Sequence, residues 1–264
     1  METITSAANP LLKDVRRASQ RGSLTDQGCA IAESFHLVEE ALRSGCEVKA
    51  VLAAESAVAA VERVPGIDRV RLIMVPDRLF QSISATENAQ GVMALVVPRQ
   101  WKLNDVFAGC PLVVVLDAMQ DPGNTGAILR AAEAFGASGA MLLKGTASPH
   151  NPKTLRAAAG SLFRLPFVDG LDAGAARAAL EARQTAIYAA VPARSGGSSR
   201  PAEEADFDRP CALAIGSEAH GVSLGLRDAA LEVSIPTLVV ESLNAAVAAG
   251  ILLYEARRQR GMQA

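Results

Sequence analysis

Five polar residues between positions 124 and 244 have side chains suited to contact with a ligand: Asn124, Arg130, Glu218, Ser242 and Asn244. Each lies in a loop or an early helical turn that follows an apolar segment of strand length. Loops at the ends of buried parallel strands are where α/β proteins bind ligands. Arg130, a single arginine on an otherwise apolar helix, either contacts a ligand there or is a solvated or salt-bridged side chain. The pattern therefore predicts a ligand site at one edge of a sheet.

The segment "LAIGSEAHG" is a glycine-flanked loop after one of these apolar runs. Because Gly216 and Gly221 let the main chain approach a ligand closely, backbone amides there can bind it. His220 is either a general base or a loop filler, and its spacing does not decide between the two. No G-x-G-x-x-G follows the strand that precedes Asn124, so the fingerprint of dinucleotide-binding enzymes is absent there.

Two groups of basic residues are candidates for contact with an RNA backbone. Lys13, Arg16 and Arg17 lie on one side of the first predicted helix, and Lys153 and Arg156 lie near the start of a later one. Cations at such positions suit phosphates. An ordinary solvated helix face is the alternative. The formal net charge of −2 argues against electrostatic binding over the whole surface and allows a local basic patch.

Composition and periodicity indicate the organisation that must position these residues. Of 264 residues, 50% are hydrophobic and only 4% aromatic, which favours helices packed on a parallel sheet over aromatic platforms for bases. Strand-length and helix-length apolar segments alternate twice, predicting a small α/β domain over 1–98, a linker over 99–110 and a second α/β domain over 111–264. In the second domain we expect helices on both faces of a parallel sheet. The Ser/Gly/Pro-rich segment 192–210 is predicted to be a surface loop.

Within the second domain, two details concern helix ends. Asp121-Pro122-Gly123 is predicted to form a turn, after which Asn124 or Thr125 caps the next helix. The small residues of 245–250 in the last helix are expected to let another stretch of backbone approach closely.

Four scattered cysteines without a C-x-x-C pair, and only three histidines, argue against a zinc site and for reduced thiols. The sequence shows no signal-peptide pattern at its N-terminus and no apolar run of membrane-spanning length. We therefore expect a soluble cytoplasmic protein with neither metal nor membrane partner.

Three stretches in this order resemble the motifs of the SpoU (TrmH-type) branch of the SPOUT RNA methyltransferases. "NTGAILR" is similar to the first motif, "LAIGSEAHG" to the second and "IPTLVVESLNAAVA" to the third. "NPKTLRAAAGSLFRLP" resembles the segment between motifs one and two. The resemblance covers about Leu112 to Arg260. Residues 1–98 are more loosely similar to the substrate-binding domain that precedes it in many members.

The resemblance implies an α/β domain with a C-terminal trefoil knot, S-adenosylmethionine bound largely by main chain, and a homodimer whose interface shapes the site. It implies methyl transfer to a ribose 2′-hydroxyl of ribosomal or transfer RNA. Carried onto this chain, the motif residues give these expected roles: Asn124, Arg130, Glu218, Ser242 and Asn244 in catalysis, and Gly216, Ile235 and Leu243 in donor binding.

Two departures from the family pattern bear on this expectation. Thr237 replaces the usual methionine after Ile-Pro, and Leu238–Val240 lacks the usual glycine. Ala32–Ser34 stands where many members have a strand exit that ends in glycine. The first departure concerns the donor pocket, so an alternative is an RNA-binding assembly factor that keeps the knot and no longer binds the donor.

Overall fold

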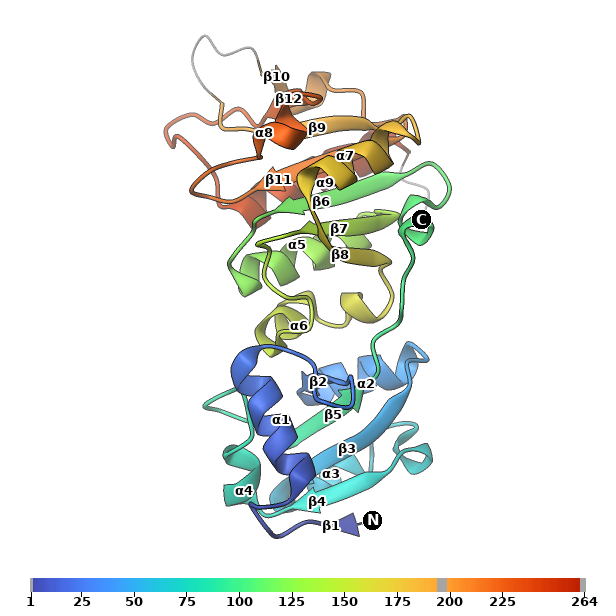
Figure 1. The fold of residues 1–264 in the computed structure, drawn as a ribbon, viewed down its shortest axis with the longest axis vertical. Coiled ribbons are helices and arrows are strands. Elements are labelled where there is room, and N and C mark those ends of the chain that lie inside the picture. Colours follow the sequence, from blue (N-terminus) through green and yellow to red (C-terminus); the bar gives the residue numbers. More distant parts are fainter. Residues whose placement is uncertain (1, 194–198, 262–264) are drawn as a thin grey trace. The chain divides into compact units, whose positions relative to one another are not determined.

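The computed structural model describes residues 2–193 and 199–261, and its internal contacts divide the chain into two compact units (Figure 1). The first unit comprises Met1–Gln100 together with Ser148–Arg164. The second comprises Trp101–Ala147 and Leu165–Ala264. The first unit thus contains a segment from the middle of the sequence, in addition to the N-terminal part that alternation alone indicates.

The first unit is built on a five-stranded mixed sheet in the order β1-β4-β3-β5-β2. Its strands are β1 (Glu2–Thr3), β2 (Ala30–Glu33), β3 (Val48–Ala54), β4 (Leu72–Val75) and β5 (Val92–Val96). β5 runs antiparallel to β2 and β3, and the other pairs are parallel. The α-helices before the linker are α1 (Pro10–Arg21), α2 (Phe35–Arg43), α3 (Val58–Val61) and α4 (Asp77–Gln81). Two 3₁₀ turns, η1 (Glu55–Ala57) and η2 (Ile67–Arg69), complete it.

The segment Ser148–Arg164 joins this unit through α6 (Pro152–Ala158), which packs on β2, and the 3₁₀ turn η4 (Ser161–Phe163). Two arginines of this segment form ion pairs with buried carboxylates of the unit. Arg156 Nη1 lies 3.8 Å from Glu33 Oε2, and Arg164 Nη1 donates to Glu40 Oε2. Because a buried carboxylate is costly unless it is paired, these contacts favour docking of the segment onto the unit.

The second unit is built on a seven-stranded sheet in the order β10-β12-β9-β11-β6-β7-β8, and every pair in it is parallel. Its strands are β6 (Leu112–Asp117), β7 (Gly139–Leu143), β8 (Phe167–Leu171), β9 (Ala186–Ala190), β10 (Arg200–Pro201), β11 (Cys211–Gly216) and β12 (Leu231–Ser234). Its helices are α5 (Pro122–Ala134), α7 (Ala173–Glu181), α8 (Leu224–Arg227) and α9 (Ala245–Gln259), with 3₁₀ turns η3 (Leu103–Phe107) and η5 (Ala202–Glu204). The predicted parallel α/β architecture is confirmed.

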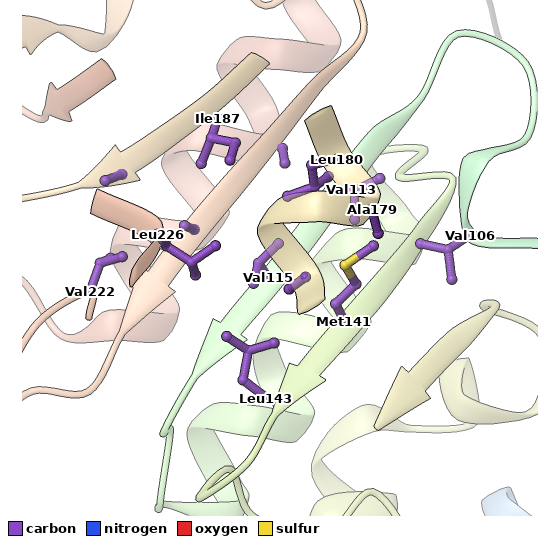
Figure 2. Close-up of a cluster of buried hydrophobic side chains, with 14 residues drawn as sticks. Val106, Val113, Val115, Met141, Leu143, Ala179, Leu180, Ile187, Val222 and Leu226 are labelled. Atoms are coloured by element: carbon purple, nitrogen blue, oxygen red, sulfur yellow. The ribbon is translucent and has the colours of Figure 1, made fainter. Parts of the chain in front are cut away.

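Side chains that alternate along the central strands bury both faces of this sheet, as expected for a parallel sheet. On one face, strand residues such as Val113, Val115 and Met141 pack with Leu180 of α7 and Leu226 of α8 (Figure 2). On the other face, α5 and α9 pack against each other and against the central strands. Helices therefore cover both faces, as the composition indicated.

Two local predictions in this unit are wrong. α5 begins at Pro122 with Asp121 as its N-cap, so neither Asn124 nor Thr125 caps it. A proline is well placed at a first helical position because it lacks only an N–H that has no intrahelical partner.

The predicted surface loop 192–210 is also not a loop throughout. Residues 194–198 lie outside the described part of the chain, but β10 and η5 follow directly, and Phe207 is fully buried against Tyr188. Burial of Phe207 and Ala205 explains why part of this segment packs on the domain, although its Ser/Gly/Pro-rich composition predicts a surface loop.

No helix within residues 2–193 and 199–261 is long and apolar enough to cross a membrane.

Candidate functional site

Three of the polar residues singled out by sequence converge in the second unit from widely separated segments. Asn124 Nδ2 donates to Glu218 Oε1 over 2.9 Å. Asn244 Nδ2 lies 3.2 Å from Asn124 Oδ1 and 3.4 Å from the same Glu218 oxygen. We call Asn124, Glu218 and Asn244 the polar triad. It ties the first turn of α5, the loop after β11 and the start of α9 together.

Helix capping determines which atoms of the two asparagines remain for the triad. Asp121 Oδ1 accepts a hydrogen bond from the Asn124 backbone N–H over 2.7 Å, which fixes the first turn of α5. Asn244 caps α9, and its Oδ1 accepts from the backbone N–H of Ala246 over 2.9 Å. Because the Asn244 oxygen is used by the cap, its amide nitrogen points to the triad as a donor.

The loop that carries Glu218 depends on an unusually close backbone approach. A Cβ on Gly216 would lie 1.9 Å from the carbonyl carbon of Gly221, so only glycine fits at position 216. The Gly221 N–H donates to the Ser217 carbonyl over 2.8 Å, and Gly221 has a φ of 67°. Among the small residues of 245–250, Ala245 and Ala249 are buried and α9 packs on α5 and β11, but a Cβ on Gly250 would meet nothing within 4 Å, so no close approach requires glycine there.

A cavity of about 500 Å³ opens beside this loop. Gly216, Ile235 and Leu243, the three residues expected to bind the donor, all line it, as do Glu218 and Ser242. The remaining wall comes mainly from the end of β9, the loops after β11 and β12, and α9. Its charged groups include three glutamates, at positions 218, 232 and 241, and Arg227, which is paired with Glu232. The cavity is therefore apolar with an acidic bias.

The loop that departs from the family pattern closes by its own hydrogen bond. Thr237 lines the cavity, and its hydroxyl donates to the Val240 carbonyl over 2.7 Å. Leu238 and Val239 are essentially fully exposed. Thr237 in place of the usual methionine therefore still forms part of a closed loop at the cavity wall. Leu238 and Val239 form an exposed apolar tip of that loop.

Arg130 lies exposed on α5, six residues after Asn124. It makes no hydrogen bond or ion pair with any residue in the described part of the chain, and it does not line the cavity. Ser242 is exposed on the cavity wall and is not bonded to the polar triad. The structure thus assembles Asn124, Glu218 and Asn244 and leaves Arg130 and Ser242 outside their hydrogen bonds.

The basic residues that are candidates for RNA contact differ in their exposure and in their intramolecular partners. Arg16 donates to the Ser82 hydroxyl and carbonyl, and Arg17 pairs with Asp14 and Asp26. Lys13 and Lys153 are exposed. Arg156 is half-buried beside Glu33. Each of the arginines has an intramolecular partner.

Sequence reasoning missed two acidic residues that shape the site. Asp121 caps α5, and Asp117, buried at the end of β6, accepts a hydrogen bond from the Ser223 backbone N–H over 2.7 Å. An aspartate that directly ends the apolar run "LVVVL" is the signal that could have identified Asp117. No group of three or more histidine, cysteine or acidic side chains in the described residues is arranged to hold a metal ion.

The fold and the site define a class of protein. It has a parallel α/β domain in which a loop with a close backbone approach at Gly216 lines a small-molecule cavity, and a polar cluster lies next to that cavity. Residues 111–254 match the model of the SpoU rRNA Methylase family, and residues 9–94 match that of the MRM3-like substrate binding domain. The chain belongs to the SpoU family, and its second unit has the knotted fold of the SPOUT methyltransferases.

Relatives of known name cover the whole length of the chain. The chain is 34% identical to the 23S rRNA (guanosine(2553)-2′-O)-methyltransferase RlmP of Bacillus subtilis, over 97% of this chain and 100% of that protein. A crystal structure of an rRNA methyltransferase from Sinorhizobium meliloti superposes with a TM-score of 0.83 at 30% identity, covering 97% of both chains. An AdoMet-bound rRNA methyltransferase structure from the same organism superposes with a TM-score of 0.80 at 29% identity, again covering 97% of both.

Proposed function

We propose that this protein transfers a methyl group from S-adenosylmethionine to a ribose 2′-hydroxyl of ribosomal RNA. The observation that carries the proposal is the polar triad of Asn124, Glu218 and Asn244, assembled beside a cavity that Gly216, Ile235 and Leu243 line. Membership of the SpoU family and full-length similarity to a 23S rRNA 2′-O-methyltransferase support the reaction class.

The cavity residues fit S-adenosylmethionine. A volume of about 500 Å³ lies within the range of pockets for ligands of this size. Ile235 and Leu243 supply an apolar surface for an adenine ring, and the glycine loop exposes main chain for hydrogen bonds. The acidic bias of the wall complements the positive sulfonium and ammonium groups of the donor.

When bound, S-adenosylmethionine supplies a methyl group activated by its positive sulfur. The residues of this chain must align the ribose hydroxyl and stabilise the charge that develops as it loses its proton. Arg130 stabilises the developing oxyanion or binds the adjacent phosphate, because a guanidinium offers several N–H donors to oxygen and no acceptor. The polar triad, with Ser242, positions the ribose and the loops around the cavity.

Residues 1–98, joined by 99–110 to the methyltransferase domain at 111–264, bind the RNA in this proposal. The match of 9–94 to a substrate-binding domain supports that role. Lys13 and Lys153 are candidates for this contact because their side chains are exposed, and Arg16, Arg17 and Arg156 are candidates that already have an intramolecular partner, as Lys153 does. Recognition by shape and backbone suits a chain with 4% aromatic residues. Four free cysteines and a ribosomal RNA substrate favour the cytoplasm as the place of action.

The protein acts as a homodimer in this proposal, formed through the outer face of α9. Val247, Ile251 and Tyr254 follow helical spacing, and each remains substantially exposed. Large apolar side chains grouped on one exposed helix face are typical of protein interfaces. Because α5 packs beside α9, a dimer through this face brings the exposed Arg130 close to the second copy.

Sedimentation tests the dimer. We expect wild-type protein to sediment as a dimer and Ile251→Arg as a monomer. Leu224→Arg, which alters an exposed leucine on α8, is the matched control and should remain dimeric. A monomeric wild-type protein at micromolar concentration would contradict the dimer.

Calorimetry with S-adenosylmethionine separates the methyltransferase from an RNA-binding assembly factor. We expect saturable binding by the wild-type protein. Ala248→Phe, which places an aromatic ring in the cavity wall, should abolish binding, whereas Gly250→Ala, which lies off the cavity, should preserve it. Absence of binding by the wild-type protein would exclude the enzyme and favour the assembly factor.

A further inference from the structure

Asp117 is a buried carboxylate at the carboxyl end of β6, with 6% of its surface exposed. Its Oδ2 accepts a hydrogen bond of 2.7 Å from the backbone N–H of Ser223, a residue 106 positions later in the sequence. A short N–H bond to an ionised carboxylate is among the stronger hydrogen bonds in proteins. The mechanism described above assigns no role to this group.

Both ends of the loop 217–223 meet at Asp117. The loop begins after Gly216, whose backbone is paired with Asp117 in the β11–β6 ladder. It ends at Ser223, which donates to the Asp117 side chain. Within the loop, the Ser217 hydroxyl accepts from the His220 N–H over 3.2 Å and the Ser217 carbonyl accepts from Gly221. Asp117 therefore joins both ends of the loop to β6, in addition to the short-range bonds, the contacts of Glu218 with Asn124 and Asn244, and the burial of Val222 in the core.

This loop supplies two parts of the proposed active site. Glu218 belongs to the polar triad, and residues 217–222 form one wall of the cavity. Asp117 is also directly continuous with α5, since Ala118 has a left-handed φ of 53° that turns the chain from β6 towards the Asp121 cap. The end of β6 thus helps to position both residues. It leads directly into the turn and helix that carry Asn124, and it holds the loop that carries Glu218 through the hydrogen bond from Ser223.

We propose that Asp117 is a positioning residue that holds loop 217–223 closed, so that Glu218 meets Asn124 and the cavity wall keeps its donor-binding form. The inference rests on the proposed function for its link to the donor. Water can replace Asp117 as an acceptor for the Ser223 N–H, but water does not attach the loop to β6. Loss of the carboxylate therefore frees the end of the loop at Ser223 without removing any residue that lines the cavity.

The test compares Asp117→Ala and Asp117→Asn with the wild-type protein. Asparagine retains an oxygen that can accept from Ser223, whereas alanine does not. We expect Asp117→Ala to raise the Kd for S-adenosylmethionine about tenfold, as the loss of one buried hydrogen bond predicts. Asp117→Asn should stay within about threefold of the wild type. At saturating donor, Asp117→Ala should also have a lower kcat than Asp117→Asn, because Glu218 is misplaced.

Ser138→Ala is the matched control for general loosening of the second unit. Ser138 bonds to the Val106 and Leu112 carbonyls near the other end of β6, away from the loop. We expect its donor affinity to equal that of the wild type. Equal donor affinity in wild type and Asp117→Ala, equal loss in Asp117→Asn and Asp117→Ala, or equal loss in Ser138→Ala would each overturn the inference.

Hydrogen exchange of the backbone amides tests the loop independently of the donor. We expect protection of Ser223 and Gly221 in the wild-type protein and in Asp117→Asn, and faster exchange of both in Asp117→Ala. Unchanged exchange in Asp117→Ala would overturn the inference even if the donor binds. Failure of the wild-type protein to bind the donor, with the exchange results as expected, would reject the proposed function and retain the role of Asp117 in closing the loop.

Discussion

Arg156 and Arg164 of the first unit differ in their surroundings from Arg130 of the second. In the first unit, Arg156 and Arg164 each lie against a buried carboxylate, Glu33 or Glu40. In the second unit, Arg130 is exposed and has no hydrogen-bond or ion-pair partner among the described residues. Tertiary placement of a carboxylate, and not the local sequence around the arginine, decides whether the guanidinium holds the fold or remains available to a substrate.

The glutamates differ in the same way. Glu33 is almost fully buried and accepts hydrogen bonds from the hydroxyls of Ser84 and Thr86 and the backbone N–H of Ala85. Glu218 is exposed, and its protein partners are the neutral amides of Asn124 and Asn244. Glu33 completes the packing of the first unit, whereas Glu218 keeps its charge exposed beside the cavity of the second.

Arg130→Ala should give the largest effect on activity. We expect kcat for RNA methylation to fall about 10²–10³-fold, as is typical when a group that stabilises a developing oxyanion is removed. The free energy of unfolding should change by no more than about 0.5 kcal/mol, because the side chain is exposed and bonds to no residue within 2–193 and 199–261. Single-turnover methylation and urea denaturation measure the two quantities. Donor affinity within about threefold of the wild type completes the expected result.

Arg164→Ala should give the reverse pattern. Removal of its guanidinium leaves Glu40 buried with Arg43, and we expect a loss of about 1–3 kcal/mol in the free energy of unfolding. Arg43→Ala removes a far more exposed partner of the same carboxylate and should cost below about 1 kcal/mol. Urea denaturation distinguishes them. A larger loss in Arg43→Ala than in Arg164→Ala would show that Glu40 does not depend on the 148–164 segment.

Ser34→Gly should give the smallest effect, a gain in stability. Ser34 has a φ of 145°, a region that is costly for residues other than glycine, and it caps α2 through its hydroxyl. Relief of the strain outweighs the lost cap and the greater freedom of glycine in the unfolded chain, so we expect about 0.5–1 kcal/mol of stabilisation. Ser44→Gly, at the other end of α2 with a φ of −73°, should be destabilising. Thermal unfolding of both variants measures the difference.

The sequence predicted the features that depend on local periodicity. Apolar runs identified the central strands. The family resemblance grouped Asn124, Glu218 and Asn244 in one site, and the three side chains are hydrogen-bonded to one another in the structure. The resemblance also placed Gly216, Ile235 and Leu243 on one cavity.

Features that depend on distant partners were not predictable in this way. The ion pair of Arg156 requires Glu33, more than a hundred residues earlier, and the burial of Phe207, which lies outside any strand, requires Tyr188 of β9. The N-cap at Asp121 was not predicted because the Pro122 that follows it suits a turn as well as a first helical position.

Mapping of 2′-O-methyl groups in ribosomal and transfer RNA tests the central claim most directly. RNA would be compared from cells with the wild-type protein, without the protein, and with Arg130→Ala. We expect a defined ribosomal RNA site to lose its methyl group without the protein, to regain it with the wild type, and to remain unmethylated with Arg130→Ala. An unchanged methylation map without the protein, or full restoration by Arg130→Ala, would contradict the account.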